Sequence, residues 1–237
     1  MTTNDDDSSD ALTPAQMLGL LQDQQRSVQG QLGGFVPVIM LTWGIAWLLG
    51  FGALWLIDGA RPGFALPLGA AIAVFCVLLA VAIAVSTVLG IRSSHGIRST
   101  RAAVFTGAVY GCTWWVGCLG IAALGGGLVS AGMSPAVANL FYPSAYVMFS
   151  GVMFIVAGAI WQAVPSVVLG GWTVLIAAVA PYFGYPTHYL FLAIAGGVGF
   201  LALGAASLVR LRSLRSRVVQ AGASGASAGA SGAPSRG

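Results

Sequence analysis

Three aromatic residues are the first candidates for chemistry, because they lie in a long stretch of the chain that carries no charge. Residues 102–209 contain no Asp, Glu, Lys or Arg, and Trp114 and Trp115 fall near the middle of an apolar run within them. Tyr110 precedes Trp114 by one helical turn and would share its face of a helix. Each indole N–H needs an acceptor there, and indole faces attract cations. These residues either fill the interior or line a pathway for an apolar or aromatic ligand or a cation, and we keep them as candidate pathway-lining residues.

Few other groups could carry out catalysis. The last acidic residue of the chain is Asp58, and the two histidines are His95 and His188. No CxxC or HExxH pattern is present. Three cysteines lie within apolar runs, where they are most simply small buried apolar residues: Cys76, Cys112 and Cys118. We therefore expect no enzyme activity, no metal site and no cofactor.

A basic cluster follows the last apolar run, and its members are candidate lipid-contacting residues. Apolar residues alternate with its arginines, which predicts a helix that continues out of the membrane with one apolar edge. Such guanidinium groups anchor a helix at the polar surface, and each adds about 1 kcal/mol of attraction where the leaflet is anionic. The cluster either fixes the orientation of the helix in the membrane or binds anionic lipid. The cluster consists of Arg210, Arg212, Arg215 and Arg217.

The elements that must position these residues are membrane-spanning helices. Only 7% of the 237 residues are charged, whereas 57% are hydrophobic. A helix needs roughly 20 apolar residues to cross the hydrocarbon core, and continuous apolar runs satisfy their own backbone hydrogen bonds only as helices. Six runs are long enough: residues 35–57, 64–91, 102–124, 139–161, 165–183 and 187–209. The predicted fold is all-α, a polytopic transmembrane bundle of six spans.

The distribution of arginine predicts the orientation of the bundle. The segment between the second and third spans and the segment after the last span are both basic, and four intervening spans place them on one side. With this side in the cytoplasm, nine arginines face inward and only Arg61 faces outward, which fits the positive-inside bias. We therefore expect cytoplasmic N and C termini. Arginine without any lysine, together with abundant Ala and Gly, is associated with a bacterial source, so the expected location is a bacterial cytoplasmic membrane.

Tyrosines agree with this layout, because their rings favour the membrane interface and their hydroxyls favour water. Five of the six are predicted at the outer boundary: Tyr142, Tyr146, Tyr182, Tyr185 and Tyr189. His188 lies beside them and changes charge near neutral pH. It is either an interface anchor or a group that responds to the outside pH.

Glycines predict where helices approach one another closely. Gly107 and Gly111 form a GxxxG on the third span, a pattern that favours tight helix contact. The sixth span is also rich in glycine, at Gly196, Gly197, Gly199 and Gly204. We expect close packing at both places.

The ends of the chain differ from the membrane domain in composition. Residues 1–10 are acidic and predicted to be disordered, and residues 11–34 have helical apolar spacing with interspersed glutamines, which predicts an amphipathic cytoplasmic or interfacial helix. Residues 35–209 form the six-helix domain, residues 210–220 a basic helical extension, and residues 221–237 a Gly/Ala/Ser tail that we expect to be disordered.

These observations favour a permease-like or transporter-associated subunit for an apolar or weakly polar solute, with the third span lining the path. Six spans, cytoplasmic ends and a leading amphipathic helix are similar in outline to the membrane subunits of some ATP-driven exporters. No GxxxxGKS loop is present, so any ATP hydrolysis would need an ATPase partner. The alternative is a non-transporting membrane regulator or assembly partner that acts through the helix of residues 11–34. Membrane lipids are expected partners. Nucleic acid is not, because the arginines flank apolar runs.

Overall fold

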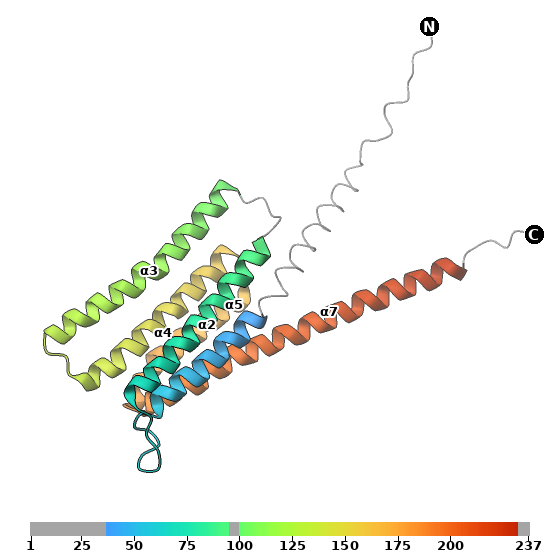
Figure 1. Cartoon of the computed structure of the whole chain (residues 1–237). Coiled ribbons are helices and arrows are strands. Elements are labelled where there is room, and N and C mark those ends of the chain that lie inside the picture. The colour runs from blue at the N-terminus through green and yellow to red at the C-terminus, as the bar shows by residue number, and fades with distance from the viewer. Residues whose placement is uncertain (1–36, 95–99, 232–237) are drawn as a thin grey trace, which may run out of the picture.

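The computed structural model describes residues 37–94 and 100–231, and within them every regular element is a helix (Figure 1). Six of its helical segments are long and apolar enough to cross a membrane: Pro37–Trp55, Leu68–Arg92, Arg101–Ser130, Pro135–Ile160, Val164–Phe183 and Thr187–Ser213. The predicted fold class and number of spans are therefore confirmed. The elements that follow the first helix are α2 (Leu68–Ser94), α3 (Arg101–Ser130), α4 (Pro135–Ile160), α5 (Val164–Val179), η1 (Ala180–Phe183), α6 (Thr187–Phe191), η2 (Leu192–Gly196) and α7 (Gly197–Ser231).

The third and fourth spans are longer than the sequence indicated, and local capping explains where they begin and end. Ser134 caps α4, with its hydroxyl accepting from the Val137 N–H at 3.3 Å, and Pro135 occupies the first turn. The fourth span therefore starts at Pro135 and not at residue 139. At the preceding end, α3 continues to Ser130, six residues beyond the predicted end, and Gly132 makes the turn with φ of 100°.

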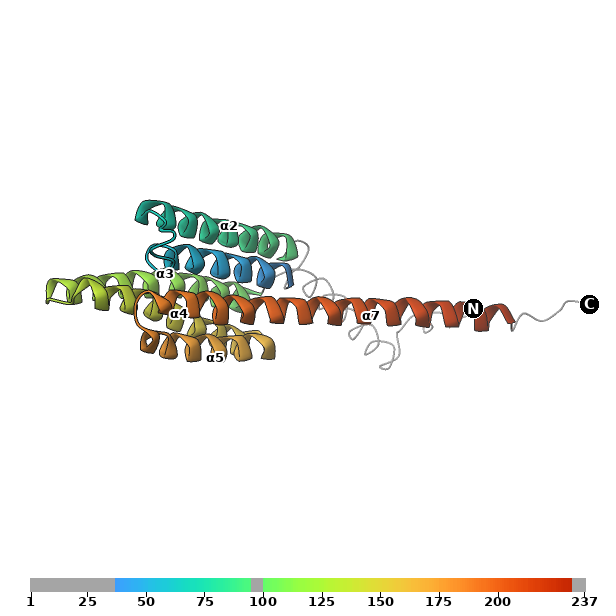
Figure 2. The same cartoon turned by 90° about the horizontal axis from the view of Figure 1, so that it is seen from below.

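The six spans form an inner group and an outer group (Figures 1 and 2). Buried residues make up 33% of the most apolar stretch of the Pro37–Trp55, Val164–Phe183 and Thr187–Ser213 spans, and 28% of that of α4. The corresponding share is 11% for α2 and 6% for α3. α2 packs against the Pro37–Trp55 helix through a Phe51–Phe75 ring contact at 5.2 Å, and α3 packs against α4.

Aromatic rings fill the centre of the inner group. Trp47 contacts Phe51 at a centroid distance of 5.5 Å and Phe200 at 5.2 Å, and Phe154 reaches Phe200 from α4 at 5.7 Å. Trp47, Phe51 and Phe200 are all buried. The middle of the inner group is thus a packed core.

The last span contains a π-helical turn, η2, at its closest approach to the other inner helices. A Cβ at Gly196 would lie 2.5 Å from the Trp47 ring, and a Cβ at Gly197 would lie 2.9 Å from Leu48. The Trp172 indole N–H on α5 donates to the Ala195 carbonyl at 3.0 Å. The close packing expected for the glycines of the sixth span is therefore present.

A tight seam also joins α4 and α5. The close packing predicted at Gly107 and Gly111 of the third span is wrong. A Cβ at Gly151 would lie 2.8 Å from the Gly170 carbonyl oxygen, and a Cβ at Gly170 would lie 2.5 Å from that of Gly151. By contrast, Cβ atoms at Gly107 and Gly111 would meet nothing within 4 Å. The GxxxG pattern shows that a close approach is sterically allowed, but other contacts decide which helix is adjacent.

The described part of the chain includes most of the C-terminal tail but not the N-terminal segment. α7 remains helical to Ser231, which differs from the disorder expected from residue 221 onward. Continuing a helix that is already formed costs little, because each added residue contributes a hydrogen bond without a new nucleation step. The acidic N-terminus, the amphipathic helix of residues 11–34 and the last residues, 232–237, lie outside the described part.

The two basic regions are at the same end of the bundle. α2 ends and α3 begins at the end from which α7 projects, and the turn between the Pro37–Trp55 helix and α2 lies at the opposite end (Figure 1). This arrangement agrees with the parity expected from the arginine clusters. We refer below to this end as the basic end. The opposite end, where Tyr182, Tyr185 and Tyr189 lie, is the tyrosine end.

Candidate functional site

The structure brings two of the three candidate pathway residues together and separates the third. Tyr110 and Trp114 point from α3 toward α4: the Tyr110 hydroxyl donates to the Met153 carbonyl at 3.2 Å, and the Trp114 ring lies 5.5 Å from that of Phe149. Their own rings are 6.4 Å apart. Trp115 is 75% exposed, so it does not share a wall with the other two.

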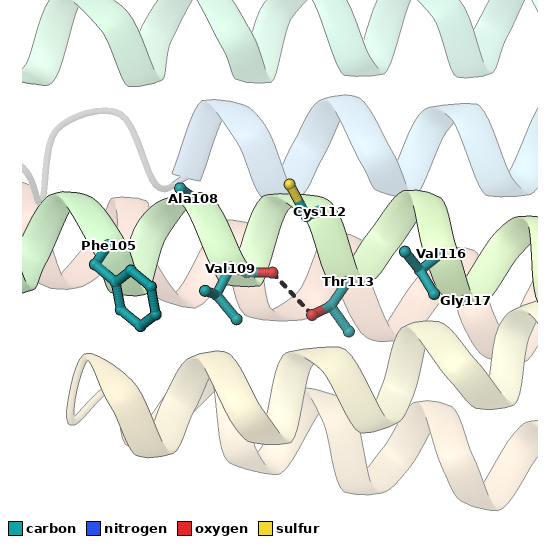
Figure 3. Close-up of a pocket in the computed structure, with 7 residues that line it drawn as sticks. All are labelled: Phe105, Ala108, Val109, Cys112, Thr113, Val116 and Gly117. Atoms are coloured by element: carbon teal, nitrogen blue, oxygen red, sulfur yellow. Dashed lines mark hydrogen bonds between the residues drawn. The ribbon is translucent and has the colours of Figure 1, made fainter.

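A shallow groove runs along a different face of α3 (Figure 3). Its volume is about 440 Å³, and all of its lining residues come from this one helix. The Thr113 hydroxyl donates to the Val109 carbonyl at 2.8 Å, so its oxygen can still accept a hydrogen bond. The remaining lining is apolar apart from one thiol. The lining residues are Phe105, Ala108, Val109, Cys112, Thr113, Val116 and Gly117.

A polar cluster lies at the tyrosine end and joins two turns that are far apart in the sequence. The Arg61 Nε lies 3.0 Å from one carboxylate oxygen of Asp58, and the Tyr185 hydroxyl donates to the other. Burial and the hydrogen bond to the negative Asp58 raise the pKa of Tyr185 to about 12. Tyr185 therefore remains protonated, and a donor, throughout the neutral range.

His188 joins α6 to α4 close to this cluster. The side chain is fully buried, with Nε2 3.0 Å from the Asn139 carbonyl oxygen and Nδ1 3.3 Å from that of Gly184. Its ring also stacks near that of Tyr189, at a centroid distance of 3.9 Å. A neutral imidazole has one N–H and can donate to only one of the two carbonyls. In this position His188 is a buried link between helices and not a side chain exposed at the interface.

The basic cluster begins where α7 leaves the bundle. Arg210 and Arg212 are exposed, and Arg215 and Arg217 follow on the same helix. Residues 210–220 lie within α7, which runs from Gly197 to Ser231. Lipid contact by these side chains remains a prediction.

The described residues contain no group of three or more metal-ligating side chains, and the three cysteines are free thiols. Cys76 and Cys112 are exposed on the outer helices, and Cys118 is half-buried. The expectation that all three are small buried residues is therefore wrong for Cys76 and Cys112, because α2 and α3 have few protein neighbours.

Sequence reasoning missed the polar cluster as a unit. Asp58 and Tyr185 are 127 positions apart, and no spacing rule relates them. The one local signal was the opposite charges of Asp58 and Arg61, which are three residues apart and so close enough to pair within a turn.

Comparison of the chain with protein families, with curated proteins and with solved structures finds no match. The functional conclusion therefore depends on the geometry described above.

Proposed function

We propose that this protein is a permease-like or transporter-associated membrane subunit that handles an apolar or weakly polar solute along α3. The observation that carries the proposal is the groove on α3, because it is a continuous apolar surface with one hydroxyl and no charge. An apolar surface with a single hydrogen-bonding group suits a solute of the same character. A charged solute would find no partner there.

The exposure of α3 supports the idea of a subunit that works with a partner. Phe105 and Val116, which line the groove, are 71% and 70% exposed. The space between the inner helices is filled by the core around Trp47. One helix cannot enclose a solute, so a second wall must come from another membrane protein. An ATP-hydrolysing partner is one such candidate for a coupled process.

The proposed orientation has the basic end and both chain termini in the cytoplasm of a bacterial cell. The support is the arginine distribution: of the arginines that the structure describes, Arg61 alone lies at the tyrosine end. Anionic lipid at the inner leaflet would then meet Arg210 and Arg212 where α7 leaves the bundle.

The test compares two matched substitutions on α3. Ala108→Phe places a ring in the groove, and Ala122→Phe places the same ring on an exposed part of α3 outside it. The probe is retention of Nile red, a neutral lipophilic dye, by cells that express each variant at equal membrane abundance. We expect wild type and Ala122→Phe to alter retention relative to the empty vector, and Ala108→Phe to abolish the effect.

Equal behaviour of the two phenylalanine variants would reject α3 as the route. A wild-type protein that leaves dye retention at the empty-vector level would count against a role in moving this class of solute. If deletion of residues 11–32 then removed capture of a protein partner, the non-transporting regulator would be the better description.

A further inference from the structure

A second groove lies on another face of the molecule, between the Pro37–Trp55 helix, α2 and α6. Its volume is about 530 Å³ and its walls are almost entirely apolar. Gly52 forms part of the floor, and a Cβ added to it would meet nothing within 4 Å. The lining residues are Leu48, Leu49, Gly52, Ala53, Trp55, Leu56, Val74, Leu78 and Leu190.

The groove leads toward the polar cluster at the tyrosine end. Leu56 lines the groove, and Asp58 follows two residues later in the turn that returns to α2, where the Leu66 N–H donates to the Leu56 carbonyl at 2.8 Å. The bottom of Figure 1 shows this turn beside the end of the first helix and the start of α2. A molecule in the groove would therefore extend from the hydrocarbon region to charged side chains.

Arg61 is suited to bind an anion at this position. Its Nε pairs with Asp58, its side chain is 64% exposed, and a guanidinium group carries five N–H donors in all. Asp58 is already occupied by Arg61 and by the Tyr185 hydroxyl. A phosphate diester matches the fork of a guanidinium group through paired charge-assisted hydrogen bonds.

We propose that this groove holds an acyl chain of a glycerophospholipid whose phosphate binds Arg61. The apolar walls accept the chain, and Arg61, in the turn that follows Leu56, donates hydrogen bonds to the phosphate. A transmembrane helix of a partner would fit the walls but would bring no anion to Arg61, which is why the charge favours a phospholipid. The inference is independent of the proposed function, because a lipid can occupy this face whether or not the protein moves a solute along α3.

The experiment is native mass spectrometry of the full-length protein in detergent, with added dioleoyl phosphatidylglycerol or with dioleoylglycerol, which has the same chains and no phosphate. Gly52→Leu fills the groove, and Arg61→Gln removes the phosphate partner. Gly107→Leu is the matched control, because its Cβ also meets nothing within 4 Å but lies on α3. Val74→Trp fills the groove from α2 if Gly52→Leu fails to fold.

We expect the wild type and Gly107→Leu to retain several-fold more phosphatidylglycerol than dioleoylglycerol. Arg61→Gln should lower the retention of phosphatidylglycerol to that of dioleoylglycerol, and Gly52→Leu should lower the retention of both lipids. Equal retention of the two lipids by the wild type, or unchanged retention by both Arg61→Gln and the folded groove-filling variant, would overturn the inference. A second protein chain that is released by Gly52→Leu would also overturn it, by showing a different occupant.

Discussion

Mean hydropathy does not separate the inner helices from the outer helices, yet the two groups differ in how many of their residues are buried. α2 has the highest mean hydropathy of the six spans, but buried residues make up only 11% of its most apolar stretch. The Pro37–Trp55 helix is less apolar, and the corresponding share is 33%. In lipid, an apolar side chain gains little from moving between acyl chains and protein, because both are equally apolar. Hydropathy therefore predicts that a helix enters the membrane and not where it lies in the bundle.

What distinguishes the inner helices is close backbone approach together with buried polar side chains. Gly151 and Gly170 let α4 and α5 touch, and buried Thr173 and His188 have their polar atoms directed at backbone carbonyls. The outer helices are connected more sparsely, for example by the Trp43 indole N–H, which donates to the Ser86 hydroxyl of α2 at 3.0 Å. The predictions below test this distinction.

The largest effect is expected at the glycine seam. Gly170→Leu drives a side chain into the Gly151 carbonyl, where backbone and not a flexible side chain would have to move. Overpacking costs about 1–3 kcal/mol even where side chains can adjust, and more where they cannot. We expect loss of monodisperse protein in detergent, measured by fluorescence-detected size-exclusion chromatography after expression.

Gly107→Leu on α3 is the control for this prediction, because the same side chain enters open space. It should elute as the wild type does, with an unchanged apparent melting temperature. Equal damage from the two substitutions would mean that α3 also has a tight contact at Gly107, and the division into inner and outer helices would have to be redrawn.

A smaller effect is expected from the buried link at the tyrosine end. His188→Ala removes the imidazole that joins the Asn139 and Gly184 carbonyls and opens space between α6 and α4, which should cost about 1–3 kcal/mol of stability. The measurement is the melting temperature in detergent. Tyr182→Ala serves as the comparison, since that side chain is 90% exposed and should leave the melting temperature unchanged. A His188→Ala protein as stable as wild type would show that the link is dispensable.

The smallest effect concerns Tyr185, which lies outside the spans. Its pKa in the folded protein is raised from 10.0 to about 12, so the folded state holds the proton more tightly than the unfolded state does. The resulting stabilisation is fully present below pH 10 and is lost as the pH rises through about 12. The difference between the tyrosinate absorbance of wild type and Tyr185→Phe should titrate near the upper value. A midpoint at 10.0 would show that Asp58 does not accept from this hydroxyl in solution.

Parts of the candidate site could be predicted and others could not. Tyr110 and Trp114 were expected on one helical face because a single turn separates them, and they do lie together against α4. Trp115 is grouped with them by its place near the middle of the span, but adjacent residues of a helix point in different directions. The groove that begins near Leu56 has walls from three separate elements, and no local pattern reports how such walls are spaced.

The sequence by itself determined that the described chain has six helices long and apolar enough to cross a membrane, and it placed each of them along the chain to within several residues. The reason is local: every backbone amide in hydrocarbon must find its partner within the same helix, so length and apolarity suffice. Only the tertiary structure decided which helices are buried, that Gly151 and not Gly107 marks a seam, and that Asp58 meets Tyr185. Those outcomes depend on shape complementarity between distant segments, which side-chain polarity does not encode when protein and lipid are equally apolar.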